Sequence, residues 1–246
     1  MLGEVVFILL GLCFGSFSNV LVHRLSKGIS IRGRSKCPHC HHVLAVADLV
    51  PVVSYILLGG SCRYCKKPIS SQYPIVEALS AVVFLGAFMM FPMEPMIALL
   101  FAFALWLLFT IGVFDYFTSF IPDALSVPLI IVGLWFQMVQ GNLPLLPILI
   151  GFTFFGFQWL ISKGRWVGSG DMFLGAGIGA LVGTVFLTGA ALFFAYIFGA
   201  LVASALLLSG KMHRKSHIPF GPFLVLGTFT VLLFQERILF IQSIWF

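Results

Sequence analysis

Residues 96–114 read MIALLFAFALWLLFTIGVF, a run of 19 residues that contains no Asp, Glu, Lys or Arg. A helix needs about 20 predominantly apolar residues to cross the hydrocarbon core of a bilayer. Similar runs recur along most of the chain, which is 60% hydrophobic and 9% charged. Because soluble domains carry about 25% charged residues, this composition excludes an ordinary soluble protein. It predicts an all-α, polytopic membrane protein.

The apolar runs predict about eight transmembrane helices. They fall in residues 4–22, 74–91, 96–114, 124–140, 144–162, 172–188, 190–209 and 220–240. Thr188 and Gly189 alone mark the boundary between the sixth and seventh spans. The first span lacks a basic n-region and a small-residue cleavage site, so we expect a retained helix and not a signal peptide. The chain then divides into a first helix (1–22), a polar segment (23–73) and a membrane domain of about seven helices (74–246).

The basic residues gather in alternate loops. If residues 23–73 face the cytoplasm, so do the loops near 115–123, 163–171 and 210–219, and together these hold 13 of the 14 Lys and Arg residues. The positive-inside rule then predicts a cytoplasmic polar segment and two termini outside. The net charge of +6 therefore reflects membrane topology and not an acidic binding partner. We expect the lipid bilayer as a partner and no nucleic acid.

Four cysteines in the polar segment have metal-ligand spacing. Cys37-Pro-His-Cys40 and Cys62-Arg-Tyr-Cys65 are two C-x2-C pairs separated by 21 residues, close to a zinc ribbon. Four thiolates close the tetrahedral shell of zinc, which makes such a site structural and not catalytic. The alternative is a disulfide relay, but a reducing cytoplasm disfavours it. The segment is too small to bury a core of its own, so a metal staple fits it.

Two aspartates stand at the ends of apolar runs. Asp115 ends the third span in GVFDYFTSFIPD, and Asp171 begins the sixth in GSGDMFLGAGIG. Ionisable groups at membrane depth are costly and usually functional. Two facing carboxyl groups share a proton, so one can activate water while the other protonates an amide oxygen. Gly168 and Gly170 would let a substrate backbone approach closely, since they carry no side chain.

Structural explanations compete with this one. Asp171 can equally be the N-cap of its helix, and for Asp123, which follows Pro122, we favour an N-cap. A transporter with a coupling acid is a further alternative, although such acids lie near the midplane of the membrane.

In their order along the chain, several segments resemble the bacterial type IV prepilin peptidases. They are GLCFGSFSNV at 11–20, RSKCPHC at 34–40, CRYC at 62–65, YPIVE at 73–77, FDYFTSFIPD at 114–123, GSGD at 168–171 and IPFGP at 218–222. Any one of these segments is weak evidence for the family, but the ordered set is specific to it and covers nearly the whole chain.

The resemblance implies an aspartic-type peptidase of the bacterial plasma membrane. It would cut prepilin and pseudopilin precursors after a glycine, on the cytoplasmic side of a hydrophobic segment, with Asp115 and Asp171 as its catalytic pair. It also implies N-methylation of the new N-terminal residue with S-adenosylmethionine. Two other functions stay open: a zinc-stapled membrane transporter or scaffold without hydrolytic activity, and a membrane thiol oxidoreductase.

Overall fold

The computed structural model describes residues 2–210 and 218–245, and these residues form helices connected by short loops. No strand occurs among them, in agreement with the predicted all-α class; two isolated β-bridges lie in the cysteine-rich segment. The helices are α1 (Leu2–Leu25), η1 (Val46–Asp48), α2 (Val53–Leu57), α3 (Gln72–Met90), α4 (Pro95–Thr118), α5 (Asp123–Val139), α6 (Leu145–Ser162), α7 (Ser169–Val182), α8 (Val185–Leu208), α9 (Gly221–Leu233) and α10 (Gln235–Trp245).

Eight of these helices overlap the eight predicted spans. Among the described residues, α1, α3, α4, α6 and α8 are long and apolar enough to cross a membrane, while α5, α7 and α9 are apolar but shorter. The protein is therefore a multi-pass membrane protein, and the helix count agrees roughly with the prediction.

Two predicted boundaries are wrong. The break expected at 188–190 lies at Gly183 and Thr184, so Thr188 is inside α8. Gly183 adopts a left-handed conformation (φ 79°) that ends α7, and the Thr184 hydroxyl accepts the amide of Leu187 to begin α8. The last span, expected at 220–240, is divided at Phe234 into α9 and α10.

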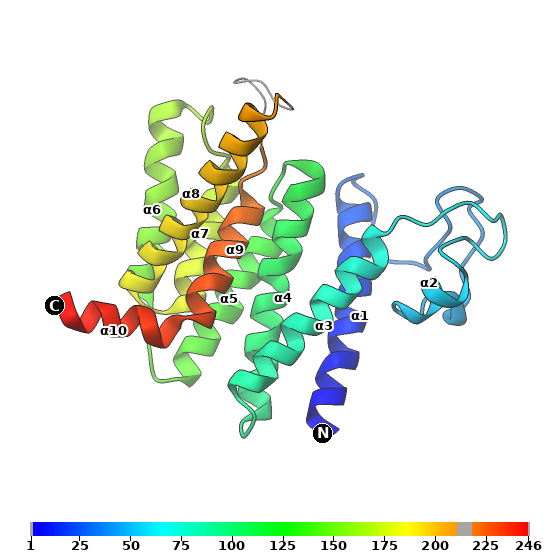
Figure 1. The fold of residues 1–246 in the computed structure, drawn as a ribbon, viewed down its shortest axis with the longest axis horizontal. Coiled ribbons are helices and arrows are strands. Elements are labelled where there is room, and N and C mark those ends of the chain that lie inside the picture. Colours follow the sequence, from blue (N-terminus) through cyan, green and yellow to red (C-terminus); the bar gives the residue numbers. More distant parts are fainter. Residues whose placement is uncertain (1, 211–217, 246) are drawn as a thin grey trace. The chain divides into compact units, whose positions relative to one another are not determined.

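The chain forms two compact units, Met1–Trp106 and Leu107–Phe246. In the first unit, α1 and α3 lie side by side, and the cysteine-rich segment connects them (Figure 1). A β-carbon at Gly11 would lie 2.6 Å from the backbone of Ala81, and one at Gly15 would lie 2.6 Å from the backbone of Glu77. This small-xxx-small pair lets the two helices approach closely, as membrane helices commonly do.

In the second unit, α7 packs between α5 and α6. Its residues from Leu174 to Val182 are all buried. The glycines of α7 make this packing possible: Gly175 and Gly179 contact the backbone of α6, and Gly177 contacts Leu129 of α5. The body of α7, whose first turn carries Asp171, therefore packs closely on α5 and α6.

Candidate active site and metal centre

Asp115 lies in the last turns of α4 and is 5% exposed. The backbone amide of Gly221, the first residue of α9, donates a hydrogen bond of 2.7 Å to Asp115 Oδ2. The first amides of a helix have no partner within the helix, and they carry a partial positive charge. Asp115 is therefore fixed in place by a residue more than 100 positions away along the chain.

Gly221 must be a glycine for this contact to form. A β-carbon there would lie 2.7 Å from Asp115 Oδ2 and 2.9 Å from Asp115 Cβ. Both distances are too short for carbon in van der Waals contact. The missing side chain of Gly221 thus gives the Asp115 carboxyl group its space.

Asp171 is the third residue of α7 and is 9% exposed. Its Oδ2 atom accepts the amide of Gly168, which is the N-cap of the helix, at 2.9 Å. This is the reciprocal half of a capping box. The N-cap position considered for Asp171 is therefore occupied by Gly168, but Asp171 still has a capping role. Such a role fixes the direction of its side chain and leaves a catalytic role open.

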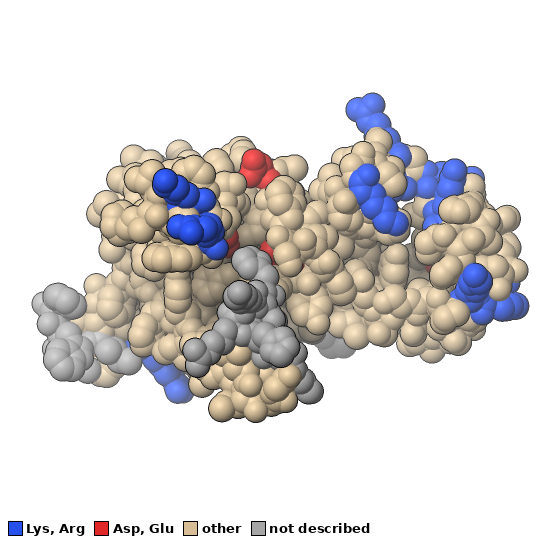
Figure 2. Space-filling model, turned by 90° about the horizontal axis from the view of Figure 1, so that it is seen from above, with Lys and Arg blue, Asp and Glu red and all other residues tan. Residues whose placement is uncertain are grey.

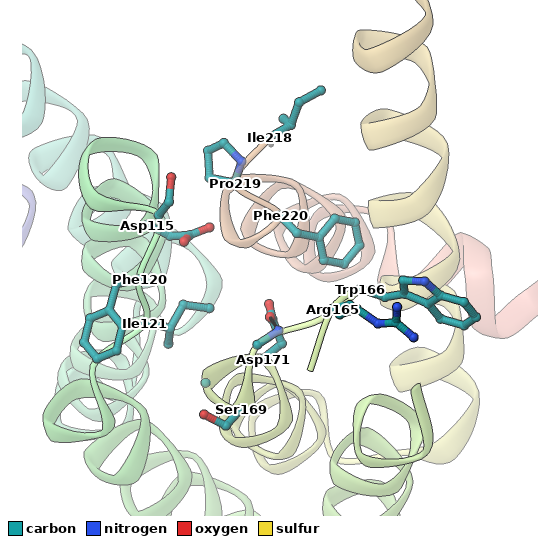
Figure 3. Close-up of a pocket in the computed structure, with 13 residues that line it drawn as sticks. Asp115, Phe120, Ile121, Arg165, Trp166, Ser169, Asp171, Ile218, Pro219 and Phe220 are labelled. Carbon is teal, nitrogen blue, oxygen red and sulfur yellow. Dashed lines mark hydrogen bonds between the residues drawn. The ribbon is translucent and has the colours of Figure 1, made fainter. Parts of the chain in front are cut away.

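The two aspartates line one pocket of about 400 Å³ in the second unit. Their carboxyl groups point into the same space from α4 and from α7 (Figure 3). The pocket is lined by Asp115, Ser119, Phe120, Ile121, Arg165, Trp166, Gly168, Ser169, Gly170, Asp171, Ile218, Pro219 and Phe220. The structure thus brings together the two acids that the sequence singles out, among mainly apolar side chains and exposed backbone.

Arg165 is the basic residue of this pocket, and its guanidinium group points away from both carboxyl groups (Figure 3). Arg165 Nε donates instead to the carbonyl of Ser162 at the end of α6, at 3.1 Å. The contacts at Asp115 and Asp171 described above therefore come from backbone amides.

The two glycines proposed to admit a substrate have different surroundings. Gly168 is exposed at the pocket and gives its amide to Asp171. Gly170 packs against Ile121, since a β-carbon there would lie 2.7 Å from Ile121 Cβ and 2.8 Å from its carbonyl oxygen. Gly170 therefore has a structural reason to lack a side chain: it lets the start of α7 approach the segment after α4.

Asp123 is exposed, does not line the pocket and is the first residue of α5. The N-cap of α5 is Pro122, one position before the residue we expected. An acid in the first turn of a helix still interacts favourably with the helix dipole. Asp123 thus has a structural position, and of the two acids in the 114–123 segment only Asp115 lies in the pocket.

The four cysteines of the first unit form a compact cluster. Their sulfur atoms all lie within 4.8 Å of one another, and the sulfurs of Cys37 and Cys65 are 3.9 Å apart. Four sulfurs bound to one zinc at about 2.3 Å would be separated by about 3.8 Å, so this set fits a tetrahedral metal site. All four are free thiols. Burial raises the pKa of Cys37, but amide hydrogen bonds from Cys40 and His39 outweigh it and lower the pKa to about 7, which favours the metal-binding thiolate.

The two cysteine turns have the same backbone design. Cys37 accepts the amide of His41 and donates its own amide to His42, while Cys62 accepts the amide of Lys66 and donates to Lys67. His41 and Lys66 both take a positive φ, of 56° and 59°. Each turn therefore presents its two sulfurs to one side.

Contacts around the second turn tie the cluster together. Asp48 accepts hydrogen bonds from Arg63 Nε at 2.6 Å and from the Tyr64 hydroxyl at 3.0 Å. The Arg63 hydrogen bond holds the pKa of Asp48 below its usual range. The rings of His42 and Tyr64, one from each turn, lie 3.7 Å apart. The sequence analysis did not foresee these contacts.

Comparison with protein families gives two matches that together cover most of the chain. Residues 9–91 match the bacterial peptidase A24 N-terminal domain, and residues 101–204 match the type IV leader peptidase family. A prepilin leader peptidase/N-methyltransferase of Burkholderia pseudomallei (strain K96243) is 35% identical, over 92% of this chain and 84% of that protein. The chain belongs to the type IV leader peptidase family.

Other members of the type IV leader peptidase family match over similar lengths. Prepilin leader peptidase/N-methyltransferases of Aeromonas hydrophila and of Bacillus subtilis (strain 168) are each 30% identical to this chain. The first match covers 94% of this chain and 90% of that protein, and the second covers 95% of each. No solved structure matches the chain.

Two parts of the pocket had a signal in the sequence but no assigned role. The IPFGP segment at 218–222 is one of those that resemble the family, and the structure gives it a position: Ile218, Pro219 and Phe220 line the pocket, and Gly221 holds Asp115. Ser119 has a positive φ of 52°, and its amide donates to the carbonyl of Asp115. This turn ends α4 directly beside the acid.

Proposed function

We propose that this protein removes the leader peptides of type IV prepilins and of related pseudopilin precursors, and that Asp115 and Asp171 perform the hydrolysis. One observation carries the proposal: two buried carboxyl groups from separate helices point into one pocket, each positioned by a backbone amide. Membership of the type IV leader peptidase family supports the same reaction.

The proposed reaction is acid–base hydrolysis of the peptide bond after the leader. Of two carboxyl groups that share a site, one is ionised and one keeps its proton. The ionised group takes a proton from a water molecule as the water oxygen attacks the scissile carbonyl, and the other gives its proton to the carbonyl oxygen. A proton then passes to the amide nitrogen, the C–N bond breaks, and the leader leaves with a new carboxyl terminus while the mature protein gains an amino terminus.

The walls of the pocket suit a substrate with an apolar segment next to the cut. Phe120, Ile121 and Phe220 supply apolar contact, and the exposed backbone at Gly168 lies beside Asp171. We propose that Gly168 contacts the substrate backbone. Gly170 would assist substrate binding indirectly, because it lets the start of α7 lie close to Ile121. Cleavage after a glycine fits a narrow position beside the two acids.

Cys37, Cys40, Cys62 and Cys65 would hold zinc in a closed four-thiolate shell. Such a shell leaves no position for substrate or water, so the zinc would stabilise the fold of the cysteine-rich segment and take no part in hydrolysis. Metal binding and folding are coupled in segments of this size.

We also propose that the protein methylates the new N-terminal residue with S-adenosylmethionine as methyl donor. The support is the name shared by its relatives, prepilin leader peptidase/N-methyltransferase. Within residues 2–210 and 218–245 no glycine-rich turn follows a strand, which is the commonest nucleotide-binding arrangement. No residue is therefore assigned to the methyl donor.

We propose that the cysteine-rich segment and the active site face the cytoplasm of a bacterial plasma membrane. The support is the distribution of basic residues, of which 13 of 14 fall in one set of alternate loops. Three of the 13, Lys211, Arg214 and Lys215, lie outside the described residues.

The test is cleavage of a purified pilin precursor by aspartate variants in detergent or nanodiscs. Asp115→Asn and Asp171→Asn should each lower kcat by about 10²–10⁴-fold, since both proton transfers are lost. Asn retains an oxygen that can accept the Gly221 or Gly168 amide, so thermal stability and zinc content should be unchanged. The double variant should be no slower than either single variant, because the pair acts as a unit.

Asp123→Asn is the matched control, as the same substitution in the same segment outside the pocket. It should keep most activity. An inactive Asp123→Asn together with an active Asp115→Asn would transfer the first catalytic role to Asp123. Full activity of both pocket variants would favour the transporter or scaffold alternative.

A further inference from the structure

The cysteine-rich segment exposes several large apolar side chains between its two cysteine turns. Six large apolar side chains within residues 46–57 are between 38% and 82% exposed: Val46, Leu49, Val50, Val53, Ile56 and Leu57. We call these six residues the loop patch. Large apolar side chains exposed together within one short segment indicate an interaction site.

Helix α2 shows how the patch is organised. Val53, Ile56 and Leu57 have the i, i+3, i+4 spacing that places side chains on one face of a helix, and all three are exposed. Tyr55, between them in sequence, turns inward, where its ring lies 3.1 Å from the position of a β-carbon on Gly60. The helix therefore has an inner face that packs on the segment and an outer apolar face.

A buried carboxylate fixes the patch against α3. The amide of Val52 donates a hydrogen bond of 2.7 Å to Glu77 Oε2, and Glu77 is 6% exposed. Val52 has a φ of 61°, which is strained for a β-branched residue. The contact with Glu77 thus maintains an unfavourable backbone conformation between η1 and α2. It holds the two halves of the loop patch at a defined place on the membrane helix.

That place is within a helix that is long and apolar enough to cross a membrane. Glu77 lies five residues into α3, which begins at Gln72, so the contact is about 7.5 Å along the helix axis from its start. The surface of α3 is already apolar there, since Ile75 and Leu79 are 53% and 47% exposed. The loop patch is therefore attached at the level where α3 presents apolar side chains to its surroundings.

The charge of the same segment selects the kind of partner. Residues 23–73 contain eight Lys and Arg residues but one acid, Asp48, which is paired with Arg63. Figure 2 shows the basic side chains grouped over this end of the first unit. A surface that combines exposed apolar residues with a rim of bases binds anionic lipid membranes.

We propose that the loop patch inserts into the bilayer surface beside α1 and α3, and that Lys and Arg residues of the same segment bind anionic phospholipid headgroups. The cysteine-rich segment is then a membrane-surface module, and its metal cluster stiffens a part of the protein that lies on lipid. The proposal does not depend on the peptidase reaction.

The test places a photoreactive benzophenone side chain at Leu57 of the full-length protein in nanodiscs of phosphatidylcholine with a minor fraction of phosphatidylglycerol. Leu57 is 79% exposed, so the larger side chain should be accommodated, and unchanged zinc content would verify the fold. Light should yield phospholipid adducts at about the level given by benzophenone at Val82, an exposed apolar position of α3. Phosphatidylglycerol should be enriched in the adducts by about twofold or more over its share of the lipid.

Two variants test the basic rim. Lys66→Gln with Lys67→Gln should remove the phosphatidylglycerol enrichment while phospholipid adducts persist, whereas Lys163→Gln in the second unit should leave the enrichment unchanged. A crosslink from Leu57 to another protein segment, or no adduct where Val82 gives one, would overturn the insertion. Equal enrichment in all variants would overturn the role of the bases.

Discussion

Replacing Gly221 by alanine tests whether Asp115 is positioned by the start of α9. The substitution adds one methyl group to a buried residue whose φ is not positive, so the backbone itself can accommodate alanine. Alanine also has the higher helix propensity. Any loss must therefore come from what the methyl group meets, and it meets Asp115.

The structure sets the size of the effect. The added carbon would lie 2.7 Å from Asp115 Oδ2 and 2.9 Å from Asp115 Cβ, and ordinary contact needs at least about 3.4 Å. Relief therefore requires a shift of about 0.5–0.7 Å in the carboxyl group or in the start of α9. A displacement near 1 Å in catalytic geometry costs about 10²-fold. We expect kcat to fall about 10–100-fold, which corresponds to about 1.4–2.7 kcal/mol of activation free energy.

The assay is kcat and KM for cleavage of a pilin precursor, measured together with the thermal midpoint of unfolding. Gly189→Ala is the matched control: Gly189 lies in α8, in the same unit, and a β-carbon there meets nothing within 4 Å. It should keep wild-type kinetics. Wild-type kcat in Gly221→Ala would refute the reasoning, because it would mean that Asp115 does not need this contact during the reaction.

Three other changes have defined outcomes. Removing the metal with a chelator, or replacing Cys37 by serine, should lower the metal content from about one zinc per chain and loosen the cysteine-rich segment in hydrogen exchange. Since zinc binds thiolates and protons compete for them, metal loss should accelerate as the pH falls. A metal-free preparation with native exchange and full activity would contradict a structural zinc. Gly170→Ala should cost about 1–3 kcal/mol of stability, because its methyl group would lie 2.7 Å from Ile121 Cβ; thermal unfolding measures this, and an unchanged midpoint would show that the start of α7 can move. An alkaline phosphatase fused to the C-terminus should be active, because the C-terminus is predicted to lie outside the cytoplasm. If that fusion were inactive while a fluorescent protein fused at the same place fluoresced in the cytoplasm, the predicted orientation would be wrong.

The membrane helices could be predicted because hydropathy is a local property. The run at 96–114 lies within α4, which extends to Thr118. The end of α7 was misplaced because Gly183-Thr184 and Thr188-Gly189 are similar small-residue pairs within one apolar run, and hydropathy does not tell which of them ends the helix. The division at Phe234 was missed although Gln235, Glu236 and Arg237 follow it directly, a polar cluster that marks the break between α9 and α10.

Site residues divide in a similar way. Rare acids at the ends of apolar runs and cysteines at C-x2-C spacing are visible in the sequence, because each depends on residue type and short separation. The amide that holds Asp115 comes from Gly221, 106 residues away, and the contact between Gly170 and Ile121 joins α7 to the connection between α4 and α5. Such contacts form only when the helices pack against one another. A glycine motif in the sequence therefore predicts that another segment approaches closely, but it does not identify that segment.

Backbone amides are suited to hold acids that must exchange protons. A Lys or Arg placed against a carboxylate at membrane depth would offset the cost of the charge, but it would also favour the ionised form and hinder proton uptake. An amide at the start of a helix supplies direction and only a partial positive charge. Asp115 and Asp171 each have such an amide, and Arg165 points away from both. In the proposed reaction each carboxyl group has to carry and release a proton in turn, and the hydrogen bonds from Gly221 and Gly168 are compatible with that requirement.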